Sequence, residues 1–196
     1  ISDPGEELVR QCYEAGIPVT SLPGPAACIT ALTMSGLPTR RFCFEAFLPT
    51  DKKEHQRVLA ELQNETRTIV LTGAAPPSAE LTELYEALGD RKASICRELT
   101  KKYETAFRTT LSQAVAYYTE NEPKGECVIV IEGKSVQEIE AEDQARRQQM
   151  SLEEHMEHYE SQGNSRKEAM KLVAKDRGIS KRDVYQYFIK NVERSS

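Results

Sequence analysis

The chain has 196 residues, of which 39% are hydrophobic and 29% charged, with a formal net charge of −5. This length and composition suffice for one full domain with an appendage or for two small domains, and they exclude a wholly disordered chain. No apolar run approaches the roughly 18 residues that span a bilayer, and no charged-then-apolar leader opens the chain. We therefore expect a cytoplasmic protein without membrane contact.

The five cysteines are odd in number, widely spaced and never form a C-x-x-C pair: Cys12, Cys28, Cys43, Cys96 and Cys127. This usage argues against a disulfide framework and against a zinc site. We expect reduced cysteines packed in a core, and no metal ion.

Charge is spread unevenly along the chain. Residues 1–150 carry 17 Lys+Arg against 23 Asp+Glu, whereas residues 151–196 carry 9 against 8. Neither part has the strongly basic balance of a protein that charge alone holds to nucleic acid. Any RNA contact therefore has to come from local patches and from shape.

The first 35 residues predict two helices joined by a short strand and a turn. The first helix ends at Gly16, with Asp3 as its N-cap and Pro4 as its first residue, and residues 17–20 predict a strand. After the turn at residues 23–25, a helix of small residues over 26–35 leaves room for close approach by a neighbouring element or a ligand.

From Phe42 onward, short apolar runs alternate with helical patterns. We expect strands at residues 42–48, 68–71, 93–96 and 127–131, and helices at residues 54–65, 78–88 and 112–119. That alternation is typical of an α/β layer fold, which we expect over residues 1–134.

After Gly133 the sequence becomes polar, and residues 135–150 predict a linker, either helical or flexible. Residues 151–196 open with a capping box of Ser151 and Glu154 and predict three short amphipathic helices. The order of helix, glycine turn and capped helix around Gly178 matches a helix-turn-helix. A small helical domain of that kind is therefore expected.

Three segments have the features of a site, and each also has a purely structural interpretation. Residues 23–27 place backbone amides ahead of a helix, which suits a flat or anionic ligand but also a tight connection. Residues 97–102 follow a buried strand, where sites of open α/β sheets lie, but a salt-bridged loop fits equally well. The glycine within residues 123–126 brings backbone close to a ligand or simply makes a turn.

His155 and His158 lie three residues apart on a predicted helix, a spacing compatible with metal ligation, but no matching third donor accompanies them. We expect both histidines, like His55, on a solvated surface. Neither a Ser-His-Asp nor a G-x-S-x-G arrangement nor a P-loop is present, so a hydrolase or a P-loop enzyme has no support.

Basic residues of the C-terminal segment could share one face: Arg166, Lys167, Lys171, Lys175, Arg177, Lys181 and Arg182. They form either a phosphate-contacting face, with Lys175, Arg177, Lys181 and Arg182 as candidate RNA contacts, or a solvated face paired with Glu168, Asp176 and Asp183. The sequence leaves both interpretations open.

A set of motifs occurs in order along residues 1–134: ISDPG, LPGPAA with ITAL, SGLP, FEAFLP, RELTK and KGE. Their joint occurrence resembles the ribosomal RNA small-subunit methyltransferase I group of the tetrapyrrole methylase superfamily. The resemblance implies the C-terminal lobe of that α/β fold, with a mixed sheet flanked by helices. The C-terminal segment resembles, more weakly, the small extra domain of some members.

The resemblance implies a cytoplasmic homodimer that binds S-adenosylmethionine and methylates the 2′-hydroxyl of a cytidine in 16S rRNA of the small ribosomal subunit. The implied cofactor contacts are Pro23, Gly24, Pro25, Ala26, Ala27, Leu71, Thr72, Thr100, Ile129 and Glu132. The implied substrate cleft contains Glu45, Arg97, Glu98, Lys101 and Lys124. No residue is assigned as the base that takes the hydroxyl proton.

Two departures from the family pattern bear on activity. The N-terminal lobe of the family has no counterpart in these residues, so we expect half of the cofactor cleft to be missing. Where members carry an aromatic-acid-Pro-His-Arg run, residues 71–78 read LTGAAPPS. This difference predicts altered substrate contacts or weakened activity.

Our leading hypothesis is an incomplete methyltransferase of this group. Two alternatives remain: a non-catalytic module that binds RNA or protein through residues 151–196, and a methylase of small tetrapyrroles. Residues 97–101 and 44–49 match the RNA branch better than the tetrapyrrole branch.

Overall fold

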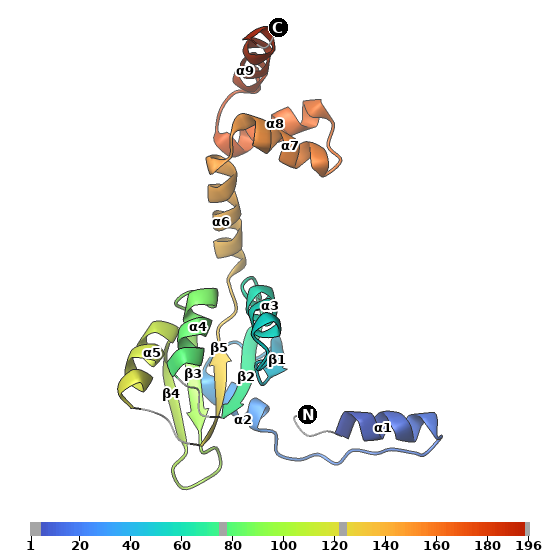
Figure 1. Ribbon diagram of the computed structural model, residues 1–196, viewed down its shortest axis with the longest axis vertical. Helices are drawn as coiled ribbons and strands as arrows, with labels where there is room; N and C mark the ends of the chain where they lie inside the picture. Colours follow the sequence, from blue (N-terminus) through green and yellow to red (C-terminus); the bar gives the residue numbers. More distant parts are fainter. Residues whose placement is uncertain (1–4, 75–77, 122–124, 195–196) are drawn as a thin grey trace. The chain divides into compact units, whose positions relative to one another are not determined.

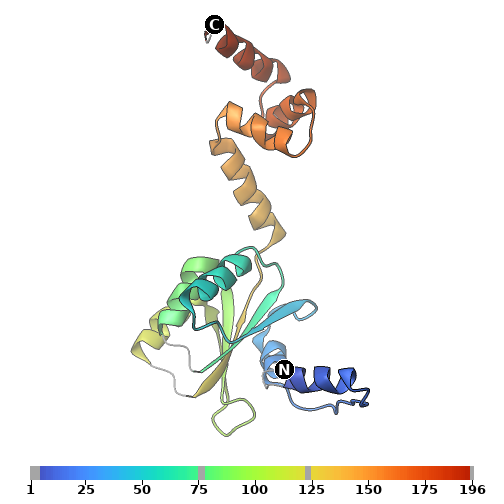
Figure 2. The same cartoon turned by 45° about the vertical axis from the view of Figure 1, so that its right-hand side comes forward.

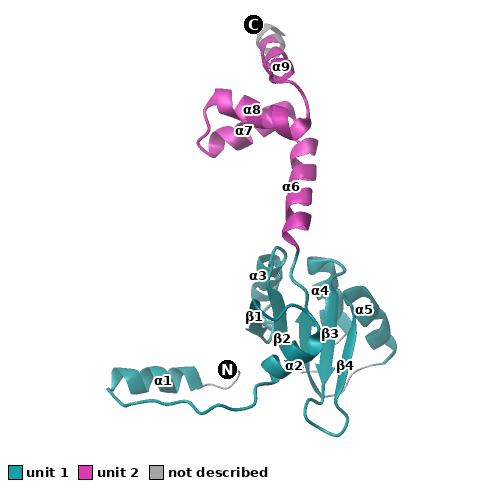
Figure 3. Cartoon of the chain, turned by 180° about the vertical axis from the view of Figure 1, so that it is seen from behind, with its two compact units in different colours: residues 1–134 teal, residues 135–196 magenta. Residues whose placement is uncertain are grey.

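A computed structural model describes residues 5–74, 78–121 and 125–194 of the chain (Figure 1). The chain divides into two compact units, residues 1–134 and residues 135–196 (Figure 3). None of the helices among the described residues is both long and apolar enough to cross a membrane.

Five strands among the described residues of the first unit form one mixed sheet, in the order β1-β2-β5-β3-β4 (Figure 1). The strands are β1 (Phe42–Ala46), β2 (Thr68–Ala74), β3 (Lys92–Arg97), β4 (Thr105–Thr110) and β5 (Glu126–Ile131). The β1–β2 pair is parallel, and the other pairs are antiparallel. The mixed α/β architecture expected from the sequence is confirmed.

Helices cover both faces of this sheet (Figure 2). The helices of the unit are α1 (Gly5–Glu14), α2 (Ala27–Ser35), α3 (Lys52–Leu62), α4 (Ser78–Leu88) and α5 (Leu111–Glu120). α3, α4 and α5 pack on one face, against side chains such as Leu71 and Ile129. α2 packs on the other face, against the alternate side chains Val70 and Val128. Each face of the sheet therefore has its own apolar layer.

One expected strand of the first unit is absent from the described residues, and one observed strand was not expected. Residues 17–20 form no strand, because Ile17 and Val19 are exposed and no neighbouring strand pairs with this segment, in which Pro18 lacks an N–H. β4 was not expected, because its sequence TAFRTT lacks an apolar run. The expected caps Asp3 and Pro4 lie outside the described residues.

The cysteines, the cap of α3 and a contact at the end of α2 are further features of this unit. Four of the five cysteines are buried, Cys12 is partly exposed, and all are free thiols. Asp51 caps α3 by accepting hydrogen bonds from the N–H groups of Lys53 and Glu54. The Arg108 guanidinium of β4 donates to the Met34 carbonyl at 2.8 Å, which fixes the end of α2 against the edge of the sheet.

Glu65, in the loop between α3 and β2, gives a pH-dependent prediction. Its carboxylate accepts hydrogen bonds from the Arg67 side chain and backbone N–H, and these bonds lower the Glu65 pKa to about 2. Because this value lies below the ordinary 4.5, the stabilisation is complete above about pH 4.5 and is lost as pH falls toward 2. Glu65→Gln should therefore destabilise the unit by about 1–2 kcal/mol at pH 7, and by progressively less as pH falls below 4.5.

Urea unfolding of the Glu65→Gln variant from pH 7 to pH 3 measures this dependence. Glu61→Gln is the matched control, since Glu61 is 63% exposed and pairs with Arg57 at 3.4 Å. An equal loss of stability for Glu65→Gln at every pH would contradict the expected role of the carboxylate charge.

The second unit is helical and has its own core. Its helices are α6 (Val136–Gln149), α7 (Leu152–Ser161), α8 (Arg166–Arg177) and α9 (Lys181–Arg194). Capping boxes begin the first three, each formed by a serine and the glutamate three residues later. Gly178, with φ of 64°, ends α8 in the left-handed region. The helix-turn-helix character of α8 and α9 stays a prediction.

Residues 135–150, expected as a linker, contribute α6 to this second unit. Arg147 of α6 donates to Asp176 of α8 at 3.2 Å and to the Tyr159 hydroxyl of α7 at 3.3 Å. The polar surface of α6 therefore includes one side that is used for packing.

Candidate functional site

A pocket of about 120 Å³ lies in the first unit, where α2 begins and where β2 and β3 end beside the start of β5. It is lined by Ala27, Thr72, Cys96, Glu98, Leu99, Lys101, Glu126, Cys127 and Val128. Loops at strand ends are the usual location of sites in α/β folds. Its residues come from segments distant in sequence that the sheet brings together.

The first turn of α2 forms one wall of the pocket. Its N-cap residue is Ala26, whose side chain makes no capping hydrogen bond within the described residues. The first amides of the helix therefore lack the side-chain acceptor that usually satisfies them. Ala27 is exposed and small, so a ligand could approach this backbone closely.

The loop between β3 and β4 forms a second wall and has a strained backbone. Glu98 and Thr100 both have positive φ, 50° and 63°, which is uncommon for residues other than glycine. The Glu104 carboxylate accepts a 2.6 Å hydrogen bond from the Thr100 N–H, and Lys101 Nζ lies 3.4 Å from Glu98 Oε1. Such strain is concentrated at functional sites in proteins.

Gly125 lies against Glu98, one of the pocket residues. With φ of 84°, Gly125 is in the left-handed region, and a Cβ there would be 3.1 Å from Glu98 Oε1. The left-handed conformation therefore favours glycine at this position, and a Cβ there would also crowd the Glu98 carboxylate.

The charged groups of the pocket are two carboxylates, Glu98 and Glu126, and one ammonium, Lys101. The two thiols are not nucleophiles at neutral pH: burial raises the pKa of Cys127 to about 12 and raises the pKa of Cys96. The pocket thus offers fixed charges of both signs and the neutral thiol of Cys96, whereas the Cys127 side chain packs in the opposite layer.

The pocket includes two of the expected cofactor contacts, Ala27 and Thr72, and two of the expected cleft residues, Glu98 and Lys101. The side chains of Leu71 and Ile129 are buried in the opposite layer, under α3, α4 and α5, because successive strand residues face opposite sides of the sheet. Thr72 and Val128 occupy the pocket side instead.

The other expected site residues lie elsewhere. Pro23, Gly24 and Pro25 are exposed ahead of α2, and Ala26 is its N-cap, but none of the four lines the pocket. Thr100 is exposed in the strained loop.

Three more expected residues lie away from the pocket. Arg97 hydrogen-bonds with Tyr118 of α5, on the face opposite α2. Glu132 follows β5 at its far end and pairs with Lys92 at 3.3 Å, and Glu45 lies on the edge strand β1. Lys124 and residues 75–77 are outside the described residues.

Five pocket residues were not named as site residues from the sequence: Cys96, Leu99, Glu126, Cys127 and Val128. Leu99 and Glu126 nevertheless lie within the candidate segments 97–102 and 123–126. Leu99 lies within the RELTK motif, so its position was a usable signal. The side chains of Cys96 and Val128 face α2, whereas that of Cys127 packs in the opposite layer, so their assignment depends on which sheet face α2 covers.

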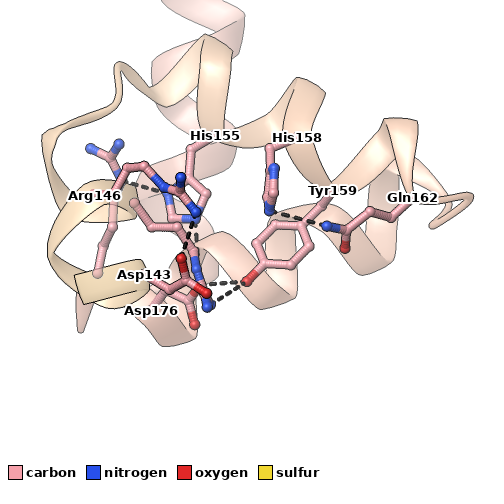
Figure 4. A network of polar contacts seen from close by, with 9 residues as sticks. Asp143, Arg146, His155, His158, Tyr159, Gln162 and Asp176 are labelled. Atoms are coloured by element: carbon pink, nitrogen blue, oxygen red, sulfur yellow. Dashed lines mark hydrogen bonds and ion pairs between the residues drawn. The ribbon is translucent and has the colours of Figure 1, made fainter. Parts of the chain in front are cut away.

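The histidine expectations need correction. His155 is fully buried, not solvated: Arg177 Nε donates to its Nδ1 at 3.1 Å, and its Nε2 lies 3.4 Å from Asp176 Oδ2 (Figure 4). His55 is 16% exposed, with Nε2 at 2.8 Å from Glu83 Oε2. No group of three or more potential metal ligands occurs among the described residues.

Arg177, a candidate RNA contact, is also turned inward. Its Nη2 donates to the carbonyls of Met150 and Ser151, which clamps the junction of α6 and α7. The other candidate contacts, Lys175, Lys181 and Arg182, are exposed.

Residues 1–115 match the family model for tetrapyrrole (corrin/porphyrin) methylases. The chain is 41% identical over 192 residues to the ribosomal RNA small subunit methyltransferase I of Bacillus subtilis (strain 168), covering 97% of this chain and 65% of that protein. The same-named protein of Synechocystis sp. is 42% identical over 188 residues, covering 95% of this chain and 66% of the relative. The chain thus spans about 65% of the length of these relatives.

A solved structure of the methyltransferase CobJ matches with a TM-score of 0.50 at 18% identity, covering 65% of this chain and 56% of that one. At this identity the likeness concerns the fold alone. Together with the match of the family model over residues 1–115, it agrees with the mixed sheet of the first unit. The chain belongs to the tetrapyrrole methylase family.

Proposed function

We propose that the chain is part of a methyltransferase that uses S-adenosylmethionine to methylate the 2′-hydroxyl of a cytidine in 16S rRNA. The observation that carries this proposal is the pocket at the strand ends of a tetrapyrrole methylase fold. Relatives about 40% identical are named for methylation of small-subunit ribosomal RNA.

The charges of the pocket residues are complementary to those of S-adenosylmethionine. S-adenosylmethionine carries a sulfonium, an ammonium, a carboxylate and ribose hydroxyls, and its sulfonium supplies an activated methyl group. Glu98 and Glu126 are suited to bind the cationic groups or the hydroxyls, and Lys101 the carboxylate. The uncapped first turn of α2 adds backbone donors beside Ala27.

The pocket is too small to hold the whole cofactor. Its volume of about 120 Å³ is below the roughly 300 Å³ at which ligand pockets begin. We therefore propose that the described residues provide one wall of a cleft and that the N-terminal lobe implied by the family resemblance provides the other.

In the proposed reaction the chain acts mainly by positioning. Displacement at the methyl carbon requires the ribose oxygen, the carbon and the sulfur in line, so rigid walls contribute by alignment. The strained Glu98–Lys101 segment, fixed by Glu104, is such a wall. The residue that accepts the hydroxyl proton stays unassigned.

The test is methyl transfer from labelled S-adenosylmethionine to purified small ribosomal subunits. The chain is assayed alone and joined to the N-terminal lobe that the family resemblance implies. We expect label from the joined protein in alkali-resistant dinucleotides, because a 2′-O-methyl group blocks cleavage at that phosphodiester. Label in mononucleotides only, or none above background, would refute 2′-O-methylation.

The proposal extends to location and assembly. We place the protein in the cytoplasm as a homodimer that needs no metal ion. Light scattering coupled to size-exclusion chromatography should give twice the mass of one chain, and a single-chain mass would reject the dimer.

A second function is favoured by the separate core of the second unit and by its exposed Lys175, Lys181 and Arg182. On this alternative, the unit binds RNA through its phosphates without catalysis. Replacing Lys181 and Arg182 by alanine should weaken RNA affinity. It should also reduce the slope of log affinity against log salt concentration by the amount expected for about two phosphate contacts. Unchanged affinity and salt slope would exclude this face.

A further inference from the structure

A hollow of about 400 Å³ lies between α6 and α7, within the second unit. It is lined by Asp143, Arg146, Arg147, Met150, His158 and Gln162. Three α6 residues and the C-cap residue Met150 recur at helical spacing and share one face. His158 of α7 lies one turn before Gln162, the C-cap of that helix. Polar side chains of two helices thus line the same space.

Residues of α7 and α8 hold in place the Arg147 side chain, which forms one wall of the hollow. Asp176 Oδ2 accepts from Arg147 at 3.2 Å and from the Tyr159 hydroxyl at 2.5 Å. His155 Nε2 lies 3.4 Å from the same oxygen, and Arg177 donates to the other ring nitrogen. The Arg147 guanidinium is therefore fixed in orientation before any ligand arrives.

The rim of the hollow retains free hydrogen-bonding groups. Arg146 is 71% exposed and uses only Nη2, toward Asp143 at 2.5 Å, among contacts of the described residues. Gln162 Nε2 lies 3.1 Å from His158 Nε2. The Gln162 Oε1 and the His158 Nδ1 have no hydrogen-bond partner within that part of the chain.

The composition of the hollow identifies the kind of ligand. Asp143 and Asp176 each offset one guanidinium charge, so a bare anion gains little net attraction. A nucleobase presents donors, acceptors and a flat face on which guanidinium groups stack. The volume lies within the usual range of small-ligand pockets, about 300–1,000 Å³.

We infer that this hollow binds one unstacked nucleotide of single-stranded RNA, with Arg147 as a fixed platform. Arg146 and Gln162 provide base-edge or phosphate contacts, and Asp143 accepts hydrogen bonds from a base edge. The inference rests on the proposed function in that RNA is taken as the substrate. It adds a contact separate from the basic face of Lys175, Lys181 and Arg182.

The experiment titrates the ¹⁵N-labelled 196-residue chain with a single-stranded hexaribonucleotide, with cytidine and adenosine monophosphates, and with inorganic phosphate. Backbone and guanidinium NMR signals of residues 143–162 should move with the nucleotides. The double variant Arg146→Ala, Gln162→Ala should bind the hexamer at least about tenfold more weakly.

Arg57→Ala is the matched control, because Arg57 is 64% exposed and pairs with Glu54 three residues away, as Arg146 does with Asp143. It should leave the affinity unchanged. The inference is overturned if the hexamer shifts no signal around the hollow, if phosphate alone binds as tightly as the nucleotides, or if the hexamer binds no better than a monophosphate. Because this experiment measures RNA binding directly, a protein that transfers no methyl group could still give the expected binding result. Failure of the inference and failure of the proposed function are therefore distinguishable.

Discussion

Gly133→Ala should lower the free energy of unfolding of the first unit by about 3 kcal/mol, an unusually large effect for one methyl group. A Cβ at Gly133 would lie 2.3 Å from the Thr66 carbonyl oxygen and 2.5 Å from that of Arg67. Both are backbone atoms, so no side chain can rotate away. The nearby hydrogen bond from the Lys134 N–H to the Glu65 carbonyl, at 2.7 Å, would be disturbed as well.

Urea unfolding monitored through signals of the first unit measures this loss. Gly89→Ala separates crowding from backbone strain, because Gly89 has φ of 78° but a Cβ there would meet no described atom within 4 Å. That control should cost about 1 kcal/mol, the usual penalty for a non-glycine residue in the left-handed region. A loss for Gly133→Ala no larger than that of the control would contradict the close packing of Gly133 against the backbone of Thr66 and Arg67.

Asp176→Asn should destabilise the second unit by about 3 kcal/mol, since removing one partner of a largely buried ion pair leaves the other charge uncompensated. The Asp176 side chain is 18% exposed and accepts hydrogen bonds from Arg147 and Tyr159. The neutral amide of asparagine would not compensate the positive charge of the Arg147 guanidinium. Loss of this anchor should loosen the contact of α6 with α8.

Amide hydrogen exchange assigns that loss to the second unit, because it reports each helix separately. Asp143→Asn is the matched control: Asp143 also pairs with an arginine of α6, but its side chain is 40% exposed and that of Arg146 is 71% exposed. It should change stability by less than about 0.5 kcal/mol. Equal losses of stability in the two variants would contradict the expectation that the buried network around Asp176 stabilises the second unit.

The same network makes the second unit sensitive to mild acid. Burial and then the neighbouring Arg177 lower the pKa of His155 below its usual 6.5. Burial alone would raise the pKa of Asp176, but hydrogen bonds from Tyr159 and Arg147 outweigh it and hold that pKa below 3.8. Neutral His155 and ionised Asp176 each stabilise the folded unit fully above the ordinary pKa of the group. As pH falls, the stabilisation from His155 is therefore lost first, below about pH 6.5.

Much of the fold was predictable, because buried strands and capped helices depend on local residue patterns. The apolar runs that became β2, β3 and β5 were located within a few residues, and so were the helices of both units. β4 was not, because an edge strand with Thr and Arg has no apolar signal and depends on pairing with β3.

The site was predictable only in outline. The RELTK and LPGPAA motifs led to Glu98, Lys101 and Ala27, all of which line the pocket. Thr72 was predicted, but Leu71 and Ile129 were predicted with it and Val128 was not. Separating them required knowledge of which sheet face α2 covers, and periodicity alone does not give it. His155 was misplaced because its neighbours Glu153 and Glu154 suggested a solvated helix.

The central claim is that the pocket at the start of α2 binds the methyl donor, and calorimetric titration with S-adenosylhomocysteine tests it most directly. The 196-residue chain, the form joined to the family's N-terminal lobe, and the variants Ala27→Leu and Thr33→Leu of each are compared. Both positions are exposed on α2, but only Ala27 lines the pocket.

We predict heat of binding for the joined protein, and a gain of about 2.7 kcal/mol in stability at 100 times Kd. Ala27→Leu should weaken binding at least about tenfold, whereas Thr33→Leu should not, because only the first side chain would fill space that the ligand needs. Absence of binding in the joined protein, or equal binding by the two leucine variants, would contradict a cofactor site in this pocket.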